Sequence, residues 1–320
     1  MNYTIRQWNA DLKDACAIHA IFKKVYPMMP IQEPELFLAM TLKHLEGVED
    51  GLFVVTNNQD IVAFSGLMER EDKDGVRLMG AVLPQFEGQN MGRSLLERTF
   101  EFCKTKKYTE IHTMCFESHP RSLSFLQTAG FVERDRIFWS DWDCQKPISA
   151  WAKKKSEMVR HAGIQIITGA EFENIREDWA QCWWKHVMIS AQDIPSTIPF
   201  EEIPFEKWRP YLELPFCDRS HVYIALDGLE LAGMLMLGIP ENNRNNINHT
   251  SVADGYRRRG ISTALKVAAI EKSRKANIQT ISTQNHQKNP MYKLNHHFGF
   301  VTTEIQIECT KKLQSEWTCL

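Results

Sequence analysis

A block of sequence occurs twice in this chain, and it constrains the fold more than any other feature. Residues 80–96 resemble residues 250–266, with matched positions 170 residues apart. A Gly-Phe pair follows each copy, at Gly130 and at Gly299, with one residue fewer between the blocks in the second copy. A repeat of this length predicts two domains with the same fold. The 320 residues of the chain also exceed the usual size of one domain.

Both copies carry the pattern for the same order of elements. We expect a short strand, helical segments, a strand hairpin, a third strand that leads through a loop into a long helix, and then a strand, a helix and a final strand. Asp227 and Gly228 form a typical hairpin turn. This order predicts an α/β (α+β) fold in which helices flank a mixed sheet. The expected ranges are 3–6, 15–25, 52–56, 61–67, 91–104, 110–116 and 121–129 in the first copy, and 164–167, 171–187, 221–226, 229–237, 261–275, 278–282 and 290–298 in the second.

The boundary between the copies is expected in a polar stretch near residues 147–162. This stretch contains three consecutive lysines, 153–155, and is followed by Gly163, as in a polar helix with a C-cap. We therefore predict a first domain at 1–146, a linker helix at 147–162 and a second domain at 163–320.

The strand, loop and helix at residues 252–266 form the segment from which a function can be inferred. A loop that enters a helix presents unpaired backbone N–H groups, and the helix dipole adds positive potential there. Residues 257–259 are three arginines, and Gly260 lets the backbone approach a phosphate closely. The spacing matches neither a Walker P-loop nor a GxGxxG dinucleotide motif. This pattern indicates an anion site, and the alternative is a solvated arginine run.

These residues resemble the GNAT superfamily of acyl-CoA N-acyltransferases. Residues 257–262 are similar to its [RQ]xxGx[GA] signature, with Ser262 in the last small position. Residues 283–300 resemble its second signature, which ends in Gly-Phe, and residues 122–131 match that signature in the first copy. The resemblance spans nearly the whole chain, and the layout is similar to that of tandem members such as mycothiol synthase.

The resemblance implies two tandem GNAT-like domains, each a splayed mixed sheet flanked by helices. Acetyl-CoA, as co-substrate, is expected in the opening of the second sheet, with its pantetheine on residues 250–254 and its pyrophosphate on residues 257–263. A primary amine of a small molecule then attacks the thioester directly, a base takes the amine proton, and an acid protonates the thiolate. The expected cofactor contacts are Thr250, Val252, Ala253, Asp254, Arg257, Arg258, Arg259, Gly260, Ile261, Ser262, Thr263, Asn285 and Asn289.

The first copy departs from the signature at two positions. Glu87 stands where Gln or Arg is expected, and Asn90 stands where Gly is expected. A carboxylate beside a pyrophosphate is repulsive by about 1–4 kcal/mol at ~4 Å. Asn90 can still adopt a left-handed backbone. We expect a degenerate cofactor loop here and one acetyl-CoA site, in the second domain.

Three residues are candidates for the catalytic groups of the second copy. Many superfamily members place a Tyr one helical turn before the Gly-Phe pair, but Asn295 holds that position here, and Tyr292 lies three residues earlier. Tyr292 either protonates the thiolate or only packs. His249 has the pKa range of a base. Asn248 holds a position at which a Glu is common in the family. Alternation along the strand places His249 on the opposite face from Asn248, so a structural role for His249 also stays open.

Charge and composition limit the other function classes. The net charge of −2 and the absence of long basic runs argue against nucleic acid as a partner, and no run of ~18 apolar residues predicts a membrane span. Adjacent His296 and His297 diverge on a helix, so no metal site is expected. We expect a cytoplasmic monomer or homodimer. The alternative function is a non-catalytic acyl-CoA-binding or regulatory tandem GNAT module.

Overall fold

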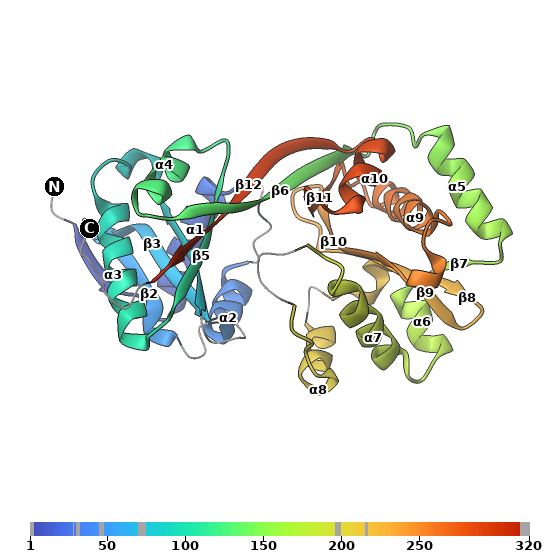
Figure 1. The fold of residues 1–320 in the computed structure, drawn as a ribbon, viewed down its shortest axis with the longest axis horizontal. Helices are drawn as coiled ribbons and strands as arrows, with labels where there is room; N and C mark the ends of the chain where they lie inside the picture. Colours follow the sequence, from blue (N-terminus) through green and yellow to red (C-terminus); the bar gives the residue numbers. More distant parts are fainter. Residues whose placement is uncertain are drawn as a thin grey trace. The chain divides into compact units, whose positions relative to one another are not determined.

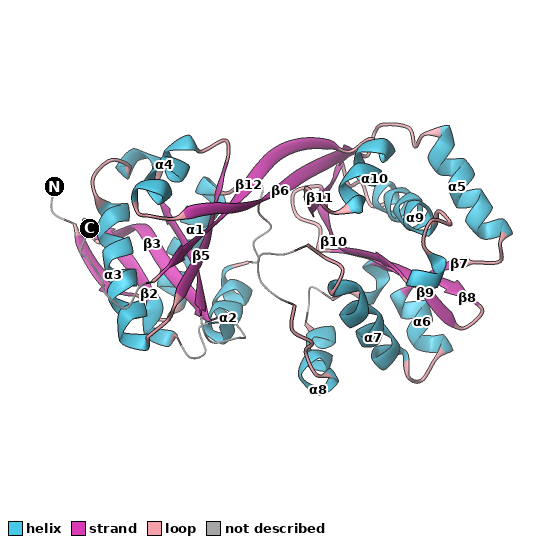
Figure 2. Ribbon diagram, viewed as in Figure 1, coloured by secondary structure: helices cyan, strands magenta, loops and turns pink. Residues whose placement is uncertain are grey.

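The computed structural model describes residues 3–27, 29, 33–44, 48–69, 75–195, 200–214 and 217–313. The chain divides into two compact units, which are described separately (Figure 1). Unit 1 consists of residues 1–134 and 307–320, and unit 2 consists of residues 135–306. Each unit combines a mixed sheet with helices, as Figure 2 shows, so the predicted α/β class is confirmed.

Unit 1 is built on a sheet with the strand order β1-β2-β3-β4-β5-β12. Strands β4 and β5 are parallel, while β1 to β4 pair with their neighbours antiparallel. The elements that begin or lie in this unit are β1 (Thr4–Gln7), α1 (Leu12–Val25), α2 (Pro34–His44), β2 (Leu52–Asn57), β3 (Asp60–Glu69), β4 (Gly75–Val82), α3 (Met91–Lys106), β5 (Glu110–Phe116), α4 (Pro120–Thr128) and β6 (Val132–Asp143).

Unit 2 repeats this plan with the strand order β12-β6-β11-β10-β9-β8-β7. Strands β10 and β11 are its parallel pair. Its elements are α5 (Ala150–His161), β7 (Gln165–Thr168), α6 (Gly169–Ile175), α7 (Trp179–Ala191), α8 (Phe205–Trp208), β8 (Val222–Asp227), β9 (Glu230–Leu237), β10 (Arg244–Val252), α9 (Ile261–Lys275), β11 (Thr280–His286), α10 (Pro290–Phe298) and β12 (Val301–Lys312).

The last strand of each repeat crosses the division between the units. The boundaries of the units fall inside β6, after Arg134, and inside β12, after Gln306. In unit 2, β6 pairs antiparallel with β11, from Ile137 opposite His286 to Asp143 opposite Thr280. The ranges predicted from the repeat, 1–146, 147–162 and 163–320, follow the order of elements, whereas the compact units exchange their final strands. The predicted domain ranges therefore remain predictions of where each repeat begins and ends in the sequence.

The linker helix and the long helix of unit 2 pack together. Helix α5 ends before Gly163, whose φ of +85° closes the helix as the sequence suggests. Ala152 and Val159 of α5 are buried in the same core as Ile261 and Leu265 of α9. The apolar face of α9 thus packs as its periodicity predicts.

One predicted helix is wrong in its extent. The range 171–187 contains two helices, α6 and α7, separated by residues 176–178. Thr168 and Glu171 form a capping box at the start of α6. Arg176 has an extended backbone and ends α6, and the second helix begins at Trp179.

Candidate functional site

Strand β10 carries a β-bulge at the point where it leaves its parallel neighbour. The register with β11 ends at Ile247 opposite Thr283, although both strands continue beyond these residues. On the other edge, β10 stays paired with β9, but the register shifts between Ile247 and His249. Asn248 is therefore an extra residue. Residues 248–252 of β10 therefore continue beyond the stretch that pairs with β11.

The matching strand of unit 1 lacks this bulge. The pairing of β4 with β3 runs without interruption from Val82 opposite Ala63 to Val76 opposite Glu69. Strands β4 and β5 also separate, after Arg77 opposite His112. Sequence reasoning missed the bulge because Asn248 lies in a run of polar residues, where an insertion leaves no break in the hydrophobic pattern.

The loops that follow β4 and β10 have the same backbone shape. Each contains a short 3-10 turn and then two residues with positive φ. In unit 2 these are Arg258 at +64° and Gly260 at +92°, and in unit 1 they are Gly88 at +75° and Asn90 at +63°. Asn90 thus takes the left-handed conformation at the start of α3, as the sequence suggested it could. The two loops differ in charge and not in backbone shape.

The three arginines of the loop have different surroundings. Arg257 forms ion pairs with Asp193 and with Asp254, and it donates a hydrogen bond to the carbonyl of Val252. The Arg259 guanidinium lies 5.1 Å from the ring centroid of Tyr256. Arg258 is exposed. Since exposed ion pairs contribute only about 0–1 kcal/mol, Arg257 can exchange its carboxylates for a phosphate.

Gly260 lies against the linker helix. A Cβ atom at Gly260 would stand 3.4 Å from the Lys155 side chain and 3.6 Å from Val159. The stem of Lys155 therefore packs beside the start of α9. Of the neighbouring residues expected to bind the cofactor, Ile261 and Thr263 have buried side chains. Only their backbone N–H groups are available to an anion.

Two histidines meet on the face of β10 that α7 covers. His186 Nε2 of α7 lies 2.8 Å from Ser251 Oγ, and His249 Nε2 lies 2.8 Å from the same oxygen. His249 Nε2 also lies 3.3 Å from Ser190 Oγ of α7. Burial lowers the pKa of His249 to about 4, and burial together with His249 lowers the pKa of His186 to about 4. Both rings are neutral near pH 7.

Because of the bulge, His249 does not lie on the strand face that simple alternation predicts. Thr250 faces α9, because its hydroxyl lies 3.4 Å from Lys266 Nζ, whereas His249 and Ser251 face α7. Asn248 accepts a hydrogen bond from Asn246 Nδ2 at 2.8 Å. Strict alternation fails here because the extra residue changes the direction of the strand. His186 was not predicted, since it is 65 residues away from Ser251 in the sequence.

The expected cofactor residues on α10 and β11 have structural contacts. Asn289 caps α10 by accepting the N–H of Met291. Asn295 is fully buried, and its Nδ2 donates to Asn285 Oδ1 at 2.6 Å. Asn295 Oδ1 is buried and finds no hydrogen-bond partner among the described residues. Asn285 and Asn295 thus form a pair between β11 and α10.

Tyr292 points toward the last strand of unit 2. Its ring centroid lies 4.7 Å from that of Phe138 on β6, and its hydroxyl lies 3.3 Å from Thr302 Oγ1 on β12. In the sheet order, β6 and β12 follow β11 on the side away from β10. These contacts favour the packing alternative for Tyr292 over the acid role.

A tyrosine contacts both of the corresponding strands of unit 1. Tyr26, which follows α1, donates a hydrogen bond to the Gly80 carbonyl of β4 at 2.9 Å. Its ring lies 5.7 Å from Phe116 of β5. Burial raises the pKa of Tyr26 to about 12. Tyr26 therefore contacts both β4 and β5 beyond the stretch in which they pair. Glu87 of the loop faces Arg121 at 3.5 Å.

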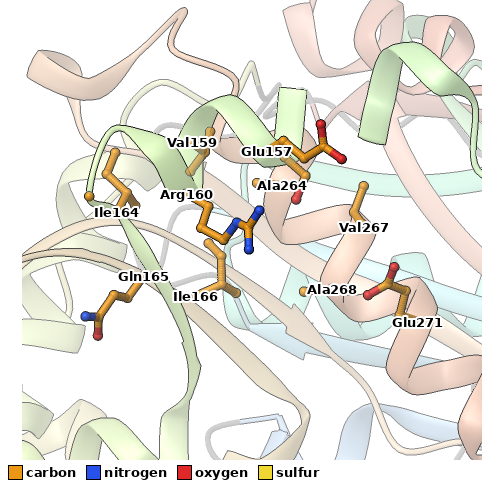
Figure 3. A pocket seen from close by; sticks show the side chains of 12 residues that line it. Glu157, Val159, Arg160, Ile164, Gln165, Ile166, Ala264, Val267, Ala268 and Glu271 are labelled. Atoms are coloured by element: carbon orange, nitrogen blue, oxygen red, sulfur yellow. The ribbon is translucent and has the colours of Figure 1, made fainter. Parts of the chain in front are cut away.

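Two surface grooves lie away from β10. One, of about 570 Å³, lies between α5, β7 and α9, and Figure 3 shows Glu157, Arg160 and Glu271 around it. The other, of about 590 Å³, follows α7 from Arg176 to Ile189. Neither is lined by a predicted site residue. In the described part of the chain, no helix is long and apolar enough to cross a membrane, and no group of His, Cys, Asp or Glu could hold a metal ion.

Comparison with known proteins adds a family to this geometry. A model described as "Acetyltransferase (GNAT) family" matches the chain twice, at residues 17–131 and 186–300. No curated protein matches the chain.

Solved structures resemble the chain over nearly its whole length. A GCN5-related N-acetyltransferase from Sphaerobacter thermophilus is 17% identical with a TM-score of 0.69, and the match covers 97% of this chain and 95% of that one. A tandem GNAT protein from the clavulanic acid biosynthesis pathway is 15% identical with a TM-score of 0.69, covering 97% and 98%. A putative acetyltransferase from Pyrococcus horikoshii is 12% identical with a TM-score of 0.56, covering 98% and 90%. At these identities the likeness concerns the fold.

Proposed function

The chain belongs to the acetyltransferase (GNAT) family and is an acyltransferase with tandem domains, and we propose that its second unit transfers an acetyl group from acetyl-CoA to a primary amine of a small molecule. The proposal assigns the cofactor to β10 and the loop after it. It assigns to unit 1 a structural or acceptor-shaping role.

The proposal rests on one observation: the part of β10 that is not paired with β11 leads directly into the start of a helix. Residues 248–252 of β10 lie beyond the end of the pairing with β11, and the loop to Gly260 leads directly from this strand into α9. The four steps from Asn248 to Val252 span about 13 Å at ~3.3 Å per residue. An extended pantetheine arm can pair with this edge while its pyrophosphate meets the N–H groups of α9. The thioester then lies beside Asn248 and His249.

The chemistry is direct transfer. The amine nitrogen attacks the thioester carbonyl, the new C–N bond forms, and the C–S bond breaks with its electron pair going to sulfur. His249 is the candidate base, because its neutral ring stands beside the thioester end of the strand. The thiolate takes its proton from solvent or from Tyr292, whose contacts with Phe138 and Thr302 make it the less favoured donor. The parent thiol has an ordinary pKa near ~8.5, so a dedicated acid is helpful but not indispensable.

Two features of unit 1 support a single cofactor site. Tyr26 lies across the separation of β4 and β5, where an acyl chain would have to enter. Glu87 places a carboxylate at the loop position of Arg257, and a nearby phosphate would be repelled by it. We therefore place the reaction in unit 2.

The proposal is tested by release of free thiol from acetyl-CoA with a panel of primary amines. The panel contains an amino sugar, α-amino acids, polyamines and arylalkylamines, and mass spectrometry identifies the acetylated product. Arg258→Glu should raise the KM for acetyl-CoA about ten- to a hundredfold, from the loss of a charge-assisted phosphate contact. Arg209→Glu, a change at another exposed arginine of unit 2, is the control. Binding of acetyl-CoA without thiol release for any amine would refute acetyl transfer.

A further inference from the structure

A directional chain of hydrogen bonds runs from α7 through β10 and back to α7. The Ser190 hydroxyl donates to the Val187 carbonyl at 3.0 Å, so its single hydrogen is used. Toward His249 Nε2, at 3.3 Å, the Ser190 oxygen can then only accept. His249 must therefore carry its hydrogen on Nε2.

The same reasoning fixes the next two groups. The same Nε2–H is shared with Ser251 Oγ, which lies closer, 2.8 Å away, so this oxygen also accepts. The Ser251 hydrogen is then free to donate to His186 Nε2, also 2.8 Å away, which must carry a lone pair. A neutral His186 holds its hydrogen on Nδ1. The two rings thus have opposite tautomers, and the neutral His249 has its lone pair on Nδ1.

We propose that His249 Nδ1 accepts the proton of the acceptor amine and that Ser251 passes the charge on to His186, which makes His186 and Ser251 positioning residues for the transfer. This inference rests on the acetyl transfer proposed above. His249 lies beside the bulge, where the thioester is expected, and His186 lies behind it, buried against the strand.

The proton steps balance along the chain. Once the amine nitrogen bonds to the carbonyl carbon, it becomes strongly acidic and gives a proton to His249 Nδ1. The hydrogen on His249 Nε2 moves to Ser251 Oγ while the Ser251 hydrogen moves to His186 Nε2. The thiolate takes a proton from solvent, and the proton on the histidines returns to solvent after the product leaves. No charge remains on the enzyme.

The surroundings of His249 and His186 keep both rings in the neutral form. Burial and, among the described groups, His249 lower the pKa of His186, and burial lowers the pKa of His249. The lone pairs are therefore present throughout the neutral range, whereas an ordinary histidine is half protonated at about pH 6.5. Ser251 is buried, so the link between the rings is shielded from bulk water.

The tautomers can be read without any substrate. Long-range ¹H–¹⁵N correlation spectra of the full chain, labelled on histidine, are recorded between pH 5.5 and 8. The spectra of His249→Gln and His186→Gln assign the two rings. We expect an Nε2–H tautomer for His249, an Nδ1–H tautomer for His186, and no titration of either ring in this range. Inverted tautomers, or a ring that titrates near pH 6.5, would overturn the chain.

Kinetics with the amine that the wild type acetylates best test the proton transfer. His249→Gln should lower kcat by about 10²-fold, with the KM for acetyl-CoA unchanged. Ser251→Ala and His186→Gln should each lower kcat about tenfold, and the double variant should be no slower than the slower single variant. The exposed His161→Gln is the control.

The outcomes separate the two proposals. Wild-type kcat in Ser251→Ala and His186→Gln would refute the relay and leave acetyl transfer intact. If no amine is acetylated, the proposed function fails, and the transfer step fails with it. Ser251→Ala removes only one hydroxyl, so it keeps the test decisive even if His186→Gln does not fold.

Discussion

Lys266 is a charged residue in the interior of unit 2, and its removal should make the protein more stable in a pH-dependent way. Its side chain is 1% exposed, on the face of α9 that packs against the sheet. Among the described residues, its Nζ has one hydrogen bond, a long one of 3.4 Å to Thr250 Oγ1. Burial lowers the pKa of Lys266 from 10.5 to about 7. A buried ammonium without a carboxylate partner disfavours the folded state.

The size and sign of the effect follow from the two pKa values. Above pH 10.5 the residue is neutral in both states and has no effect. Between pH 10.5 and about 7 it is charged only in the unfolded chain. The free energy of unfolding therefore falls by about 1.4 kcal/mol for each unit by which the pH is lowered. Below pH 7 the loss is constant at about 5 kcal/mol. The contribution of Lys266 to stability therefore rises with pH from 7 to 10.5.

Lys266→Met keeps the volume and removes the ionisable group. We expect the variant to be more stable than the wild type by several kcal/mol at pH 7, with the difference disappearing toward pH 10.5. Urea unfolding of both proteins at pH 6 to 10 measures the difference between their free energies of unfolding. The contributions of the other titrating groups are common to both proteins and cancel in this difference. Lys275→Met, at an exposed position of the same helix, is the control. A difference that does not change with pH, or a less stable Lys266→Met at pH 7, would refute the buried, unpaired ammonium.

Three further predictions test the site. Tyr292→Phe should leave kcat unchanged because the tyrosine packs on Phe138; a decrease of about 10²-fold with the best amine would make Tyr292 the acid. Gly260→Asn should keep the affinity for acetyl-CoA, because Asn90 already adopts the left-handed conformation at the matching position; Gly260→Val should lose it, and equal binding by the two would contradict the backbone argument. Calorimetry should give one acetyl-CoA per wild-type chain, since Tyr26 of unit 1 already contacts both β4 and β5; two sites of similar affinity would contradict this.

Much of the fold was predictable because the repeat fixes it. Helix α9 extends from Ile261 to Lys275 as expected from its apolar spacing, and α10 begins at Pro290, which suits the first turn of a helix. The exchange of β6 and β12 between the units was not predictable. Strand patterns show which residues alternate but not which sheet a strand joins.

The candidate site was predictable only where it depends on local sequence. The left-handed Gly260 follows from the loop signature, but the ion pairs of Arg257 depend on Asp193, far away in the sequence. The bulge at Asn248 shifts His249 to the α7 face, and alternation alone cannot show such an insertion. His186 meets Ser251 only after folding, so no spacing rule could identify it.

The central claim is that acetyl-CoA binds along the free edge of β10 and on the loop before α9. Hydrogen–deuterium exchange of the full chain, with and without acetyl-CoA, tests it most directly. Peptides covering residues 248–263 should exchange more slowly with the cofactor present, because their N–H groups bind pantetheine and pyrophosphate. The matching peptides of unit 1, at residues 78–93, should exchange at the same rate in both conditions. Protection of residues 78–93, or no protection of 248–263 at saturating acetyl-CoA, would contradict the account.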